Sequence, residues 1–442
     1  MAVADLPHRP RSGGPTMKRL AAGTRRLVPH ALRRDPRDRW AAAFGRIAVY
    51  SFTVAVVTGV LLLPFFRPSM ATVVYRGSYR KLDGATMSQV YQSVLAISFD
   101  VRGGLLIRQV HHWSADLFVA AICLRLLRVF FRARFSGRAL PDWLIWVALL
   151  PLGMLAAYTG TLLPDDGLSG GSLSVDTGVL LSVPVTGTHL VFAIFGGAPP
   201  GHQITGRDYW VHILVLPALA AALLLAGFRP RRRWPRPVRP DPLLPFTCAV
   251  LVLLGAIAQI DPVWLEGPSQ PGSISAGAVP DWYMGFLEGA LRIMPAWELT
   301  VAGHPLALGV LIAGLAVPGL FFTCLAAYPV ADRRIADLAN RTAAGVAGLT
   351  FYGLLWAKAA NDQIAYHLQV PLYTVTWILR VTVPAGPALA FLLTRVTCHA
   401  LAAQRRDEEL HGRETGRIVM DPQGGYTEIR EPAHPAAWPS RS

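Results

Sequence analysis

Charged side chains are scarce in this chain, in which only 16% of the 442 residues are Asp, Glu, Lys or Arg and 52% are hydrophobic. Such a balance is too apolar for a typical soluble domain. A helix needs about 20 apolar residues to cross a hydrocarbon core of about 30 Å. Residues 47–66 meet this length, and the basic segment before them is too long for a cleaved signal peptide. We therefore interpret them as a retained membrane helix.

Cysteine is also rare, with four residues in the whole chain and no CxxC pair. This spacing excludes the usual signatures of zinc sites, iron–sulfur clusters and c-type hemes held by the chain itself. All four cysteines lie in or beside apolar segments, where a small buried hydrophobic side chain is the simplest role. They are Cys123, Cys248, Cys324 and Cys398.

Acidic residues are outnumbered, since 27 Asp and Glu stand against 42 Lys and Arg and the net charge is +15. The arginines cluster between apolar stretches rather than on one helical face, which argues against nucleic acid as a partner. Residues 164–206 and 361–379 contain no Lys or Arg at all. Because cytoplasmic loops favour basic residues, we expect an even number of spans and two cytoplasmic termini.

Eight stretches are apolar and long enough to predict spanning helices, so the predicted fold class is an all-α integral membrane protein. Two long external loops each contain an amphipathic stretch that we expect to lie in the membrane interface, at residues 168–184 and 280–294. The predicted spans are residues 46–66, 112–132, 143–163, 208–228, 245–261, 305–328, 343–360 and 372–398.

Two histidines begin predicted spans, His111 in the second and His212 in the fourth. An ionisable side chain inside a membrane is costly, which makes a function the default interpretation. Each could simply hydrogen-bond a neighbouring helix. Two imidazoles at matching depth on non-adjacent helices equally predict shared ligation of a metal such as heme iron. Arg108 lies on the face of His111 and could pair with a heme propionate or extend to the membrane edge.

Three stretches resemble one known family: residues 98–113 (SFDVRGGLLIRQVHHW), residues 280–292 (PDWYMGFLEGALR), which open with a form of a Pro-Glu/Asp-Trp-Tyr motif, and residues 411–419 (HGRETGRIV). On these motifs the chain resembles the cytochrome b family, and closely its actinobacterial branch. The order and context of the motifs make the resemblance specific. Further residues that fit it are Gly45, Gly59 and the Leu-Pro-Asp-Asp of residues 163–166.

The resemblance implies an eight-helix fold with a heme-binding four-helix bundle in its N-terminal half, where two b hemes lie between the second and fourth spans. It implies a quinol–cytochrome c oxidoreductase subunit that oxidises quinol, here menaquinol, on the external side. One electron would pass to a Rieske iron–sulfur subunit and the other through the hemes to an inner quinone site. A cytochrome c subunit, a homodimeric complex and the plasma membrane are implied as well.

By resemblance, His111 and His212 match the ligands of the external heme, and Arg108 its propionate partner. Asp281 matches the acidic group that accepts a proton from quinol, and Tyr283 its neighbour. Asp281 could instead cap a helix, and the aromatic pair after it could anchor the chain at the interface. The other residues that match the heme pocket are Gly45, Gly59 and Arg128, the last of which could equally be a cytoplasmic charge anchor.

The second heme's ligands are missing from the expected places. In the family they follow the first histidine of each helix by 14 or 15 residues, which is about 21 Å along a helix. These places hold Arg125 after His111, and Ala226 and Gly227 after His212. Arg stays protonated and cannot ligate iron, and Ala and Gly have no donor. We therefore predict a single heme, with Arg125 either filling the vacated volume or extending to the cytoplasmic edge.

The loop after the fourth span departs from the family too, because residues 229–239 are a run of Arg and Pro where the family has His and Lys near its inner quinone site. Two functions stay open: a quinol-oxidising subunit, or a non-catalytic or mono-heme paralogue with a structural or assembly role. A transporter is disfavoured because the chain shows no internal repeat or paired broken helices of the transporter kind.

The predicted parts are a basic cytoplasmic segment (1–39), the heme-binding bundle (40–240), a C-terminal membrane region with the outer quinol motif (241–400) and a cytoplasmic tail (401–442).

Overall fold

The computed structural model describes residues 39–196, 204–227, 241–270, 281–301, 304–335, 337–420 and 422–431. Within these residues the chain is mostly helical and forms three small antiparallel sheets of two strands each. The predicted N-terminal segment up to residue 38, the arginine-rich loop 229–239 and Pro280 lie outside the described residues.

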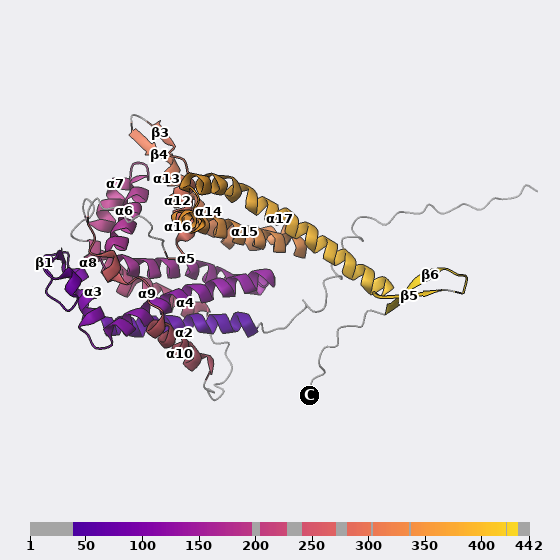
Figure 1. Cartoon of the computed structure of the whole chain (residues 1–442), viewed down its shortest axis with the longest axis horizontal. Coiled ribbons are helices and arrows are strands. Elements are labelled where there is room, and N and C mark those ends of the chain that lie inside the picture. Colours follow the sequence, from indigo (N-terminus) through magenta and orange to yellow (C-terminus); the bar gives the residue numbers. More distant parts are fainter. Residues whose placement is uncertain are drawn as a thin grey trace, which may run out of the picture.

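Four helical segments form the N-terminal half of the molecule (Figure 1). Three are continuous: α2 (Arg39–Leu62), α4 (Gly104–Phe131) and α5 (Leu140–Leu162). The fourth consists of α8 (Ile204–Trp210), one turn of π-helix η4 (Val211–Val215) and α9 (Leu216–Gly227). Single π-turns inside helices occur frequently at functional sites, and this one carries His212.

The four segments pack in sequence, α2 against α4, α4 against α5 and α5 against α9, and α10 (Leu243–Ile257) covers α4 and α2. Their apolar faces meet in one core. Five of its large side chains are almost completely buried: Phe118, Ile122, Trp143, Trp146 and Leu149. Such packing holds side chains on facing helices in fixed positions.

The C-terminal half is built on the pair α15 (Leu338–Ala359) and α17 (Leu372–His411), which pack along each other (Figure 1). The helix that precedes them begins with α13 (Leu308–Leu311), passes through a second π-turn, η5 (Ile312–Ala316), and continues as α14 (Val317–Ile335). The short α16 (Asn361–Leu368) joins α15 to α17.

Short elements gather at the end of the helices opposite the β5–β6 hairpin (Figure 1). The two stretches that we expect to lie in the membrane interface, 168–184 and 280–294, contain the helices α6 (Gly167–Leu181) and α12 (Gly285–Ile293). The remaining elements are α3 (Gln89–Phe99), α7 (Gly187–Phe195), α11 (Val263–Glu266), β1 (Thr72–Val74), β2 (Thr86–Ser88), β3 (Glu298–Val301), β4 (His304–Ala307), β5 (Arg413–Met420), β6 (Tyr426–Glu431), η2 (Arg80–Leu82) and η3 (Gly137–Ala139).

All eight predicted spans coincide with helices, which confirms the all-α membrane fold class. In the described residues, α10 is shorter than predicted because the chain becomes extended at Ala258 and reaches Pro262 shortly afterwards. Helix α4 carries charged side chains along its length and α10 has only 15 residues, so a count of eight spans stays a prediction. Among the residues that the structure describes, five segments are long and apolar enough to cross a membrane: Arg39–Leu62, Gly137–Leu162, Gly206–Gly227, Leu308–Asp332 and Leu372–His411.

The start of α4 differs from the prediction in a way that matters for the site. The helix begins at Gly104, so His111 lies two turns inside it rather than at its beginning. Gly103 takes a left-handed φ of 75°, and a Cβ on Gly104 would overlap the carbonyl oxygen of Ile97. Only glycine accommodates both demands. This tight turn from α3 into α4 thereby sets the depth of His111.

Candidate functional site

His111 on α4 and His212 on η4 face each other across the bundle. Their ring centroids are 6.1 Å apart and the rings are inclined at 75°. A metal–imidazole bond is about 2 Å long, so the gap leaves room for one metal ion between the two rings. The predicted pairing of these two histidines at one depth is thus present in the structure.

Each imidazole is oriented through its Nδ1 atom. Nδ1 of His111 lies 2.9 Å from the carbonyl oxygen of Ala55 and 3.1 Å from Oγ1 of Thr58 on α2. Nδ1 of His212 lies 3.1 Å from Oγ1 of Thr159 on α5. Such partners fix the tautomer of a ligating histidine and leave Nε2 for the metal. Hydrogen bonding to a neighbouring helix and ligation, the two alternatives from the sequence, are therefore compatible.

Two glycines give the histidine rings their space. A Cβ atom on Gly59 of α2 would lie 3.1 Å from Cε1 of His111, and a Cβ atom on Gly160 of α5 would lie 2.8 Å from Cε1 of His212. The first distance is tighter than most Cβ contacts and the second is shorter than real Cβ atoms show, so a larger residue at either position would push the imidazole out of its place. Gly59 was expected at the heme pocket from the sequence, whereas Gly160 was not.

A cavity of about 250 Å³ opens beside the two rings and is lined by His111, His212, Gly59, Gly160 and Arg108. Nη2 of Arg108 donates to the carbonyl oxygen of Asp261 at 2.9 Å. Its Nη1 atom is buried and has no hydrogen-bond partner among the described residues. A buried donor of this kind calls for an acceptor, and the carboxylate of a heme propionate would supply one. The donor set at this end of the bundle therefore fits a heme with two imidazole ligands.

The other end of the same bundle holds Arg125 and Trp146 in contact with each other. Arg125 does not extend to solvent, because its side chain is only 14% exposed. Its guanidinium donates to Oδ2 of Asp142 at 2.9 Å and to the carbonyl oxygen of Ala41 at 2.6 Å, and it lies 4.3 Å from the ring centroid of Trp146. Of the two interpretations from the sequence, the structure agrees with the one in which Arg125 occupies interior volume, with Asp142 as its anion.

The other residues expected here are Gly45, which is buried on α2, Arg128, which is half-buried in the last turn of α4, and Ala226 and Gly227 at the end of α9.

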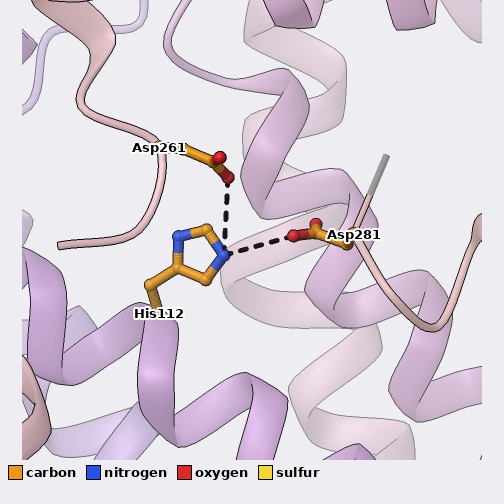
Figure 2. A group of neighbouring side chains, drawn as sticks. All are labelled: His112, Asp261 and Asp281. Atoms are coloured by element: carbon orange, nitrogen blue, oxygen red, sulfur yellow. Dashed lines mark ion pairs between the residues drawn. The ribbon is translucent and has the colours of Figure 1, made fainter. Parts of the chain in front are cut away.

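A second polar cluster lies next to the cavity, around Asp281, Trp282 and Tyr283 of the motif that resembles the cytochrome b family. The phenol of Tyr283 donates to Oδ2 of Asp281 at 2.7 Å, and the Asp281 side chain does not cap α12, whose first turn begins after Met284. Nε2 of His112 lies 3.6 Å from Oδ1 of Asp281 and 3.7 Å from Oδ2 of Asp261 (Figure 2). One imidazole and two carboxylates at this spacing could share a proton or hold a cation.

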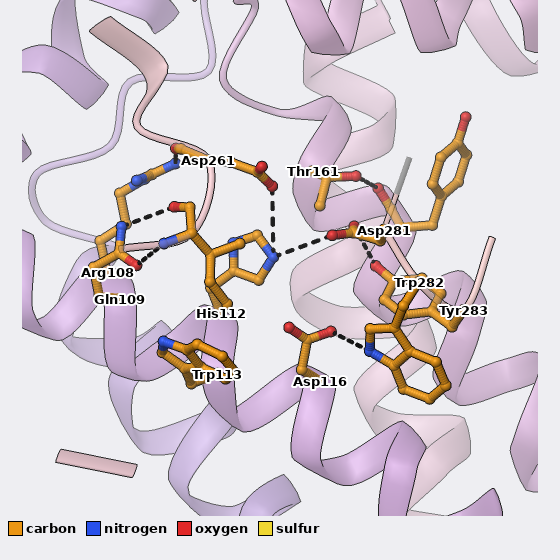
Figure 3. Close-up of polar contacts among 12 residues, drawn as sticks. Arg108, Gln109, His112, Trp113, Asp116, Thr161, Asp261, Asp281, Trp282 and Tyr283 are labelled. Atoms are coloured by element: carbon orange, nitrogen blue, oxygen red, sulfur yellow. Dashed lines mark hydrogen bonds and ion pairs between the residues drawn. The ribbon is translucent and has the colours of Figure 1, made fainter. Parts of the chain in front are cut away.

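The loop after α10 reaches this cluster because α4 holds it in place (Figure 3). The amide of Gln109 exchanges two hydrogen bonds with the backbone of Ile260, at 2.9 and 2.8 Å. Nε1 of Trp113 donates to the carbonyl oxygen of Ala258 at 2.8 Å. On the other side, Nε1 of Trp282 donates to Oδ1 of Asp116 at 3.1 Å. One face of α4 therefore fixes both Asp261 and the segment that carries Asp281.

Burial shapes the chemistry of the groups that lie outside the spanning helices. It raises the pKa of Asp261 above its ordinary value, and it raises the pKa of Tyr283, whose side chain is 2% exposed. Tyr283 consequently keeps its proton at neutral pH and acts as a donor to Asp281. Burial of this kind disfavours the charged form of an acid.

Three members of this cluster were not predicted from the sequence: His112, Asp116 and Asp261. A signal was available for two of them, because His112 and Asp116 are four residues apart on one face of a predicted spanning helix. Asp261 could not be placed, since its position depends on how the loop after α10 folds back onto α4.

Fold and site together describe an integral-membrane helical bundle with a paired-histidine pocket at one end and an acidic cluster beside it. Residues 116–268 match the family model described as Cytochrome b(N-terminal)/b6/petB. The chain is 39% identical to the cytochrome bc1 complex cytochrome b subunit of Streptomyces coelicolor over 97% of its own length and 86% of that protein. It is also 39% identical to the subunit of the same name from Mycobacterium tuberculosis, over 90% of this chain and 78% of that protein. The chain therefore belongs to the family of cytochrome b subunits of cytochrome bc1 complexes.

The fold agrees with this assignment. A solved structure titled hyperthermophilic respiratory Complex III is similar with a TM-score of 0.54, at 17% identity, and the match covers 79% of this chain and 92% of that one. At this identity the likeness concerns the fold alone. It extends beyond the segment matched by the family model and includes helices from both halves of the chain.

Proposed function

We propose that this chain is the cytochrome b subunit of a respiratory bc complex, that it oxidises quinol at the external end of the bundle, and that it holds one b heme there. The observation that supports this most directly is the facing pair His111 and His212, each oriented through Nδ1 and each given room by a glycine. The unpartnered Nη1 of Arg108 supplies the contact for a propionate.

Asp281 and Tyr283 would handle the protons. Oxidation of a quinol to a quinone releases two protons and two electrons. The phenol of Tyr283 holds Oδ2 of Asp281, which leaves Oδ1 on the side of His112 to take one proton from a quinol hydroxyl. The other proton would leave towards the Rieske subunit together with the electron that this partner accepts. A bound b heme would accept one of the electrons, and the other would pass to a Rieske iron–sulfur subunit. Asp281 is nearly buried, with 11% of its side chain exposed, so the step would occur out of bulk water.

The remaining features of the proposal come from the family. A cytochrome c subunit, a homodimeric complex and menaquinol as the substrate fit a bc complex of the actinobacterial kind. The basic loops between the spans favour a plasma-membrane protein with both termini in the cytoplasm. Arg125, Ala226 and Gly227 stand where the second pair of ligands would be expected, which limits the proposal to one heme.

Heme content tests this proposal. The protein is purified from membranes and its b heme per chain is measured by pyridine hemochrome, for wild type, His111→Ala and His367→Ala. His367 is exposed on α16 and serves as the matched control. We expect one heme in wild type and in the control, and none in His111→Ala. Two hemes per chain in wild type would refute the single-heme assignment.

The absence of inner ligands also favours a second candidate, a mono-heme paralogue that does not oxidise quinol. Reduction of the heme by a menaquinol analogue separates the two functions. An active subunit reduces its heme when quinol is added, and Asp281→Asn slows this reduction without changing the heme content. A heme that quinol does not reduce in wild type would identify the non-catalytic paralogue.

A further inference from the structure

Corresponding positions in the two helix pairs of the bundle lie 101 residues apart. His212 follows His111 at this interval, Gly160 follows Gly59, and Thr159 follows Thr58. Their contacts correspond as well, because each Thr hydroxyl faces a histidine Nδ1 at 3.1 Å and each glycine faces a histidine Cε1. The pair α2 and α4 and the pair α5 and α9 therefore build the outer site in the same way.

The same correspondence can be followed to the inner end. Fourteen residues is close to four helical turns, so a position 14 residues along lies on the same face about 21 Å away. On α4 and α9 this gives Arg125 and Ala226. On α2 it gives Gly45, which is again a glycine, but on α5 the position that corresponds to Gly160 is Trp146. A position that should hold the smallest residue thus holds the largest.

The indole of Trp146 lies between the helices that would carry the second pair of ligands. Arg125 of α4 stacks 4.3 Å from its ring centroid. A Cβ atom on Gly227 of α9 would lie 3.5 Å from its Nε1. That Nε1 donates to Oδ1 of Asp142 at 3.2 Å. The side chain is 2% exposed, so the ring is enclosed on both sides by the bundle.

We propose that Trp146, held by Arg125 and Asp142, occupies the inner cofactor volume and by itself excludes a second heme, even if both iron ligands are restored. This inference rests on the proposed single heme at the outer end. Close-packed interiors do not accept extra volume, and a buried Trp side chain covers about 150–250 Å². The loss of the second heme would then be a matter of space as well as of ligands.

Three variants test the proposal by heme content. Arg125→His/Ala226→His restores an imidazole on each helix and leaves Trp146 in place. The second variant adds Trp146→Gly to this pair. The third adds Trp143→Gly instead, as a matched control, because Trp143 lies on the same helix, is equally buried and directs its Nε1 to the carbonyl oxygen of Leu325. We expect one heme per chain in the first and third variants and two in the second.

Each result bears on the proposal. A second heme in Arg125→His/Ala226→His would overturn it, and so would a variant with Trp146→Gly that keeps its outer heme but gains no other. If the variant with Trp146→Gly also loses its outer heme, we conclude that it has not folded. The heme content of the corresponding variant with Trp146→Ala is then measured instead. Wild type with two hemes would instead refute the single-heme function, whereas one heme in wild type and two in the double variant would refute only the role of Trp146.

Discussion

The contact between Arg125 and Asp142 gives a stability prediction that can be worked from the structure. Removing one member of a buried ion pair costs about 3–5 kcal/mol, whereas an exposed pair contributes about 0–1 kcal/mol. Here the Arg125 side chain is 14% exposed and that of Asp142 is 40% exposed, so solvent screens the pair in part. We expect Asp142→Asn to cost about 1–2 kcal/mol, between these limits.

Two further contacts keep the loss at this level. Arg125 retains its hydrogen bond to the carbonyl oxygen of Ala41 at 2.6 Å and its position over Trp146, and a cation–π contact contributes about 0.5–2 kcal/mol. A loss of 1–2 kcal/mol corresponds to a shift of roughly 2–8 °C on the scale of 150–250-residue domains. The chain is longer than that, which places the expected shift at the lower end.

A double-mutant cycle measures the pair directly. The apparent unfolding temperature in detergent is recorded at a fixed heating rate, because membrane proteins often unfold irreversibly, for wild type, Asp142→Asn, Arg125→Gln and the double variant. The matched control is the same cycle on Arg430 and Glu414, whose side chains are 37% and 59% exposed. We expect a clear coupling for the first cycle and little for the second. Additive effects at Arg125 and Asp142 would refute the reasoning, since contacting partners that stabilise each other do not add.

Two further outcomes are expected at the end of the bundle that carries the paired histidines. Tyr283→Phe keeps the buried ring but removes the hydrogen bond to Asp281. Because such a bond to a charged group is worth about 1.5–3 kcal/mol, quinol-dependent heme reduction should slow by roughly 10- to 100-fold. An unchanged rate at unchanged heme content would exclude the role of Tyr283. Burial raises the pKa of Asp165 from 3.8 to about 6. Because this folded-state pKa lies above the unfolded one, its contribution to stability is present below about pH 4 and is lost as the pH rises through about 6. As the pH rises through this window, the unfolding temperature of wild type should therefore fall more steeply than that of Asp165→Asn. Asn is chosen because it tolerates the backbone φ of 56° at position 165. Equal slopes would contradict the raised pKa of Asp165.

Hydropathy was sufficient to predict where most of the helices lie. A spanning helix fixes the depth of its side chains, so His111 and His212 could be placed at one depth, whereas their assignment as a ligand pair came from the resemblance to the cytochrome b family. The boundaries were less accurate. Helix α4 begins at Gly104, where residue 112 was expected, and α17 continues to His411, where residue 398 was expected. The β5–β6 hairpin after α17 was not predicted, because its strands mix polar and apolar residues without a regular period.

The polar cluster could not be derived in the same way, because it depends on loops. Asp261 reaches His112 only because Gln109 and Trp113 hold the segment after α10 against α4. Sequence spacing does not encode such a contact between residues about 150 positions apart. The sequence also left the position of Arg125 open, since its partners Asp142 and Trp146 become neighbours only when α4 and α5 pack together.

One end of the bundle contains a cavity, whereas side chains occupy the corresponding volume at the other end, and this difference bears on function. An empty apolar cavity costs stability in proportion to its volume, and the 250 Å³ beside His111 and His212 is lined mostly by apolar groups. At the inner end Trp146 and Arg125 remove this cost by filling the volume. A chain that had lost all cofactor binding would gain as much by closing the outer cavity, yet Gly59 and Gly160 keep it open. Retention of these two glycines therefore favours a ligand that still binds between the histidines.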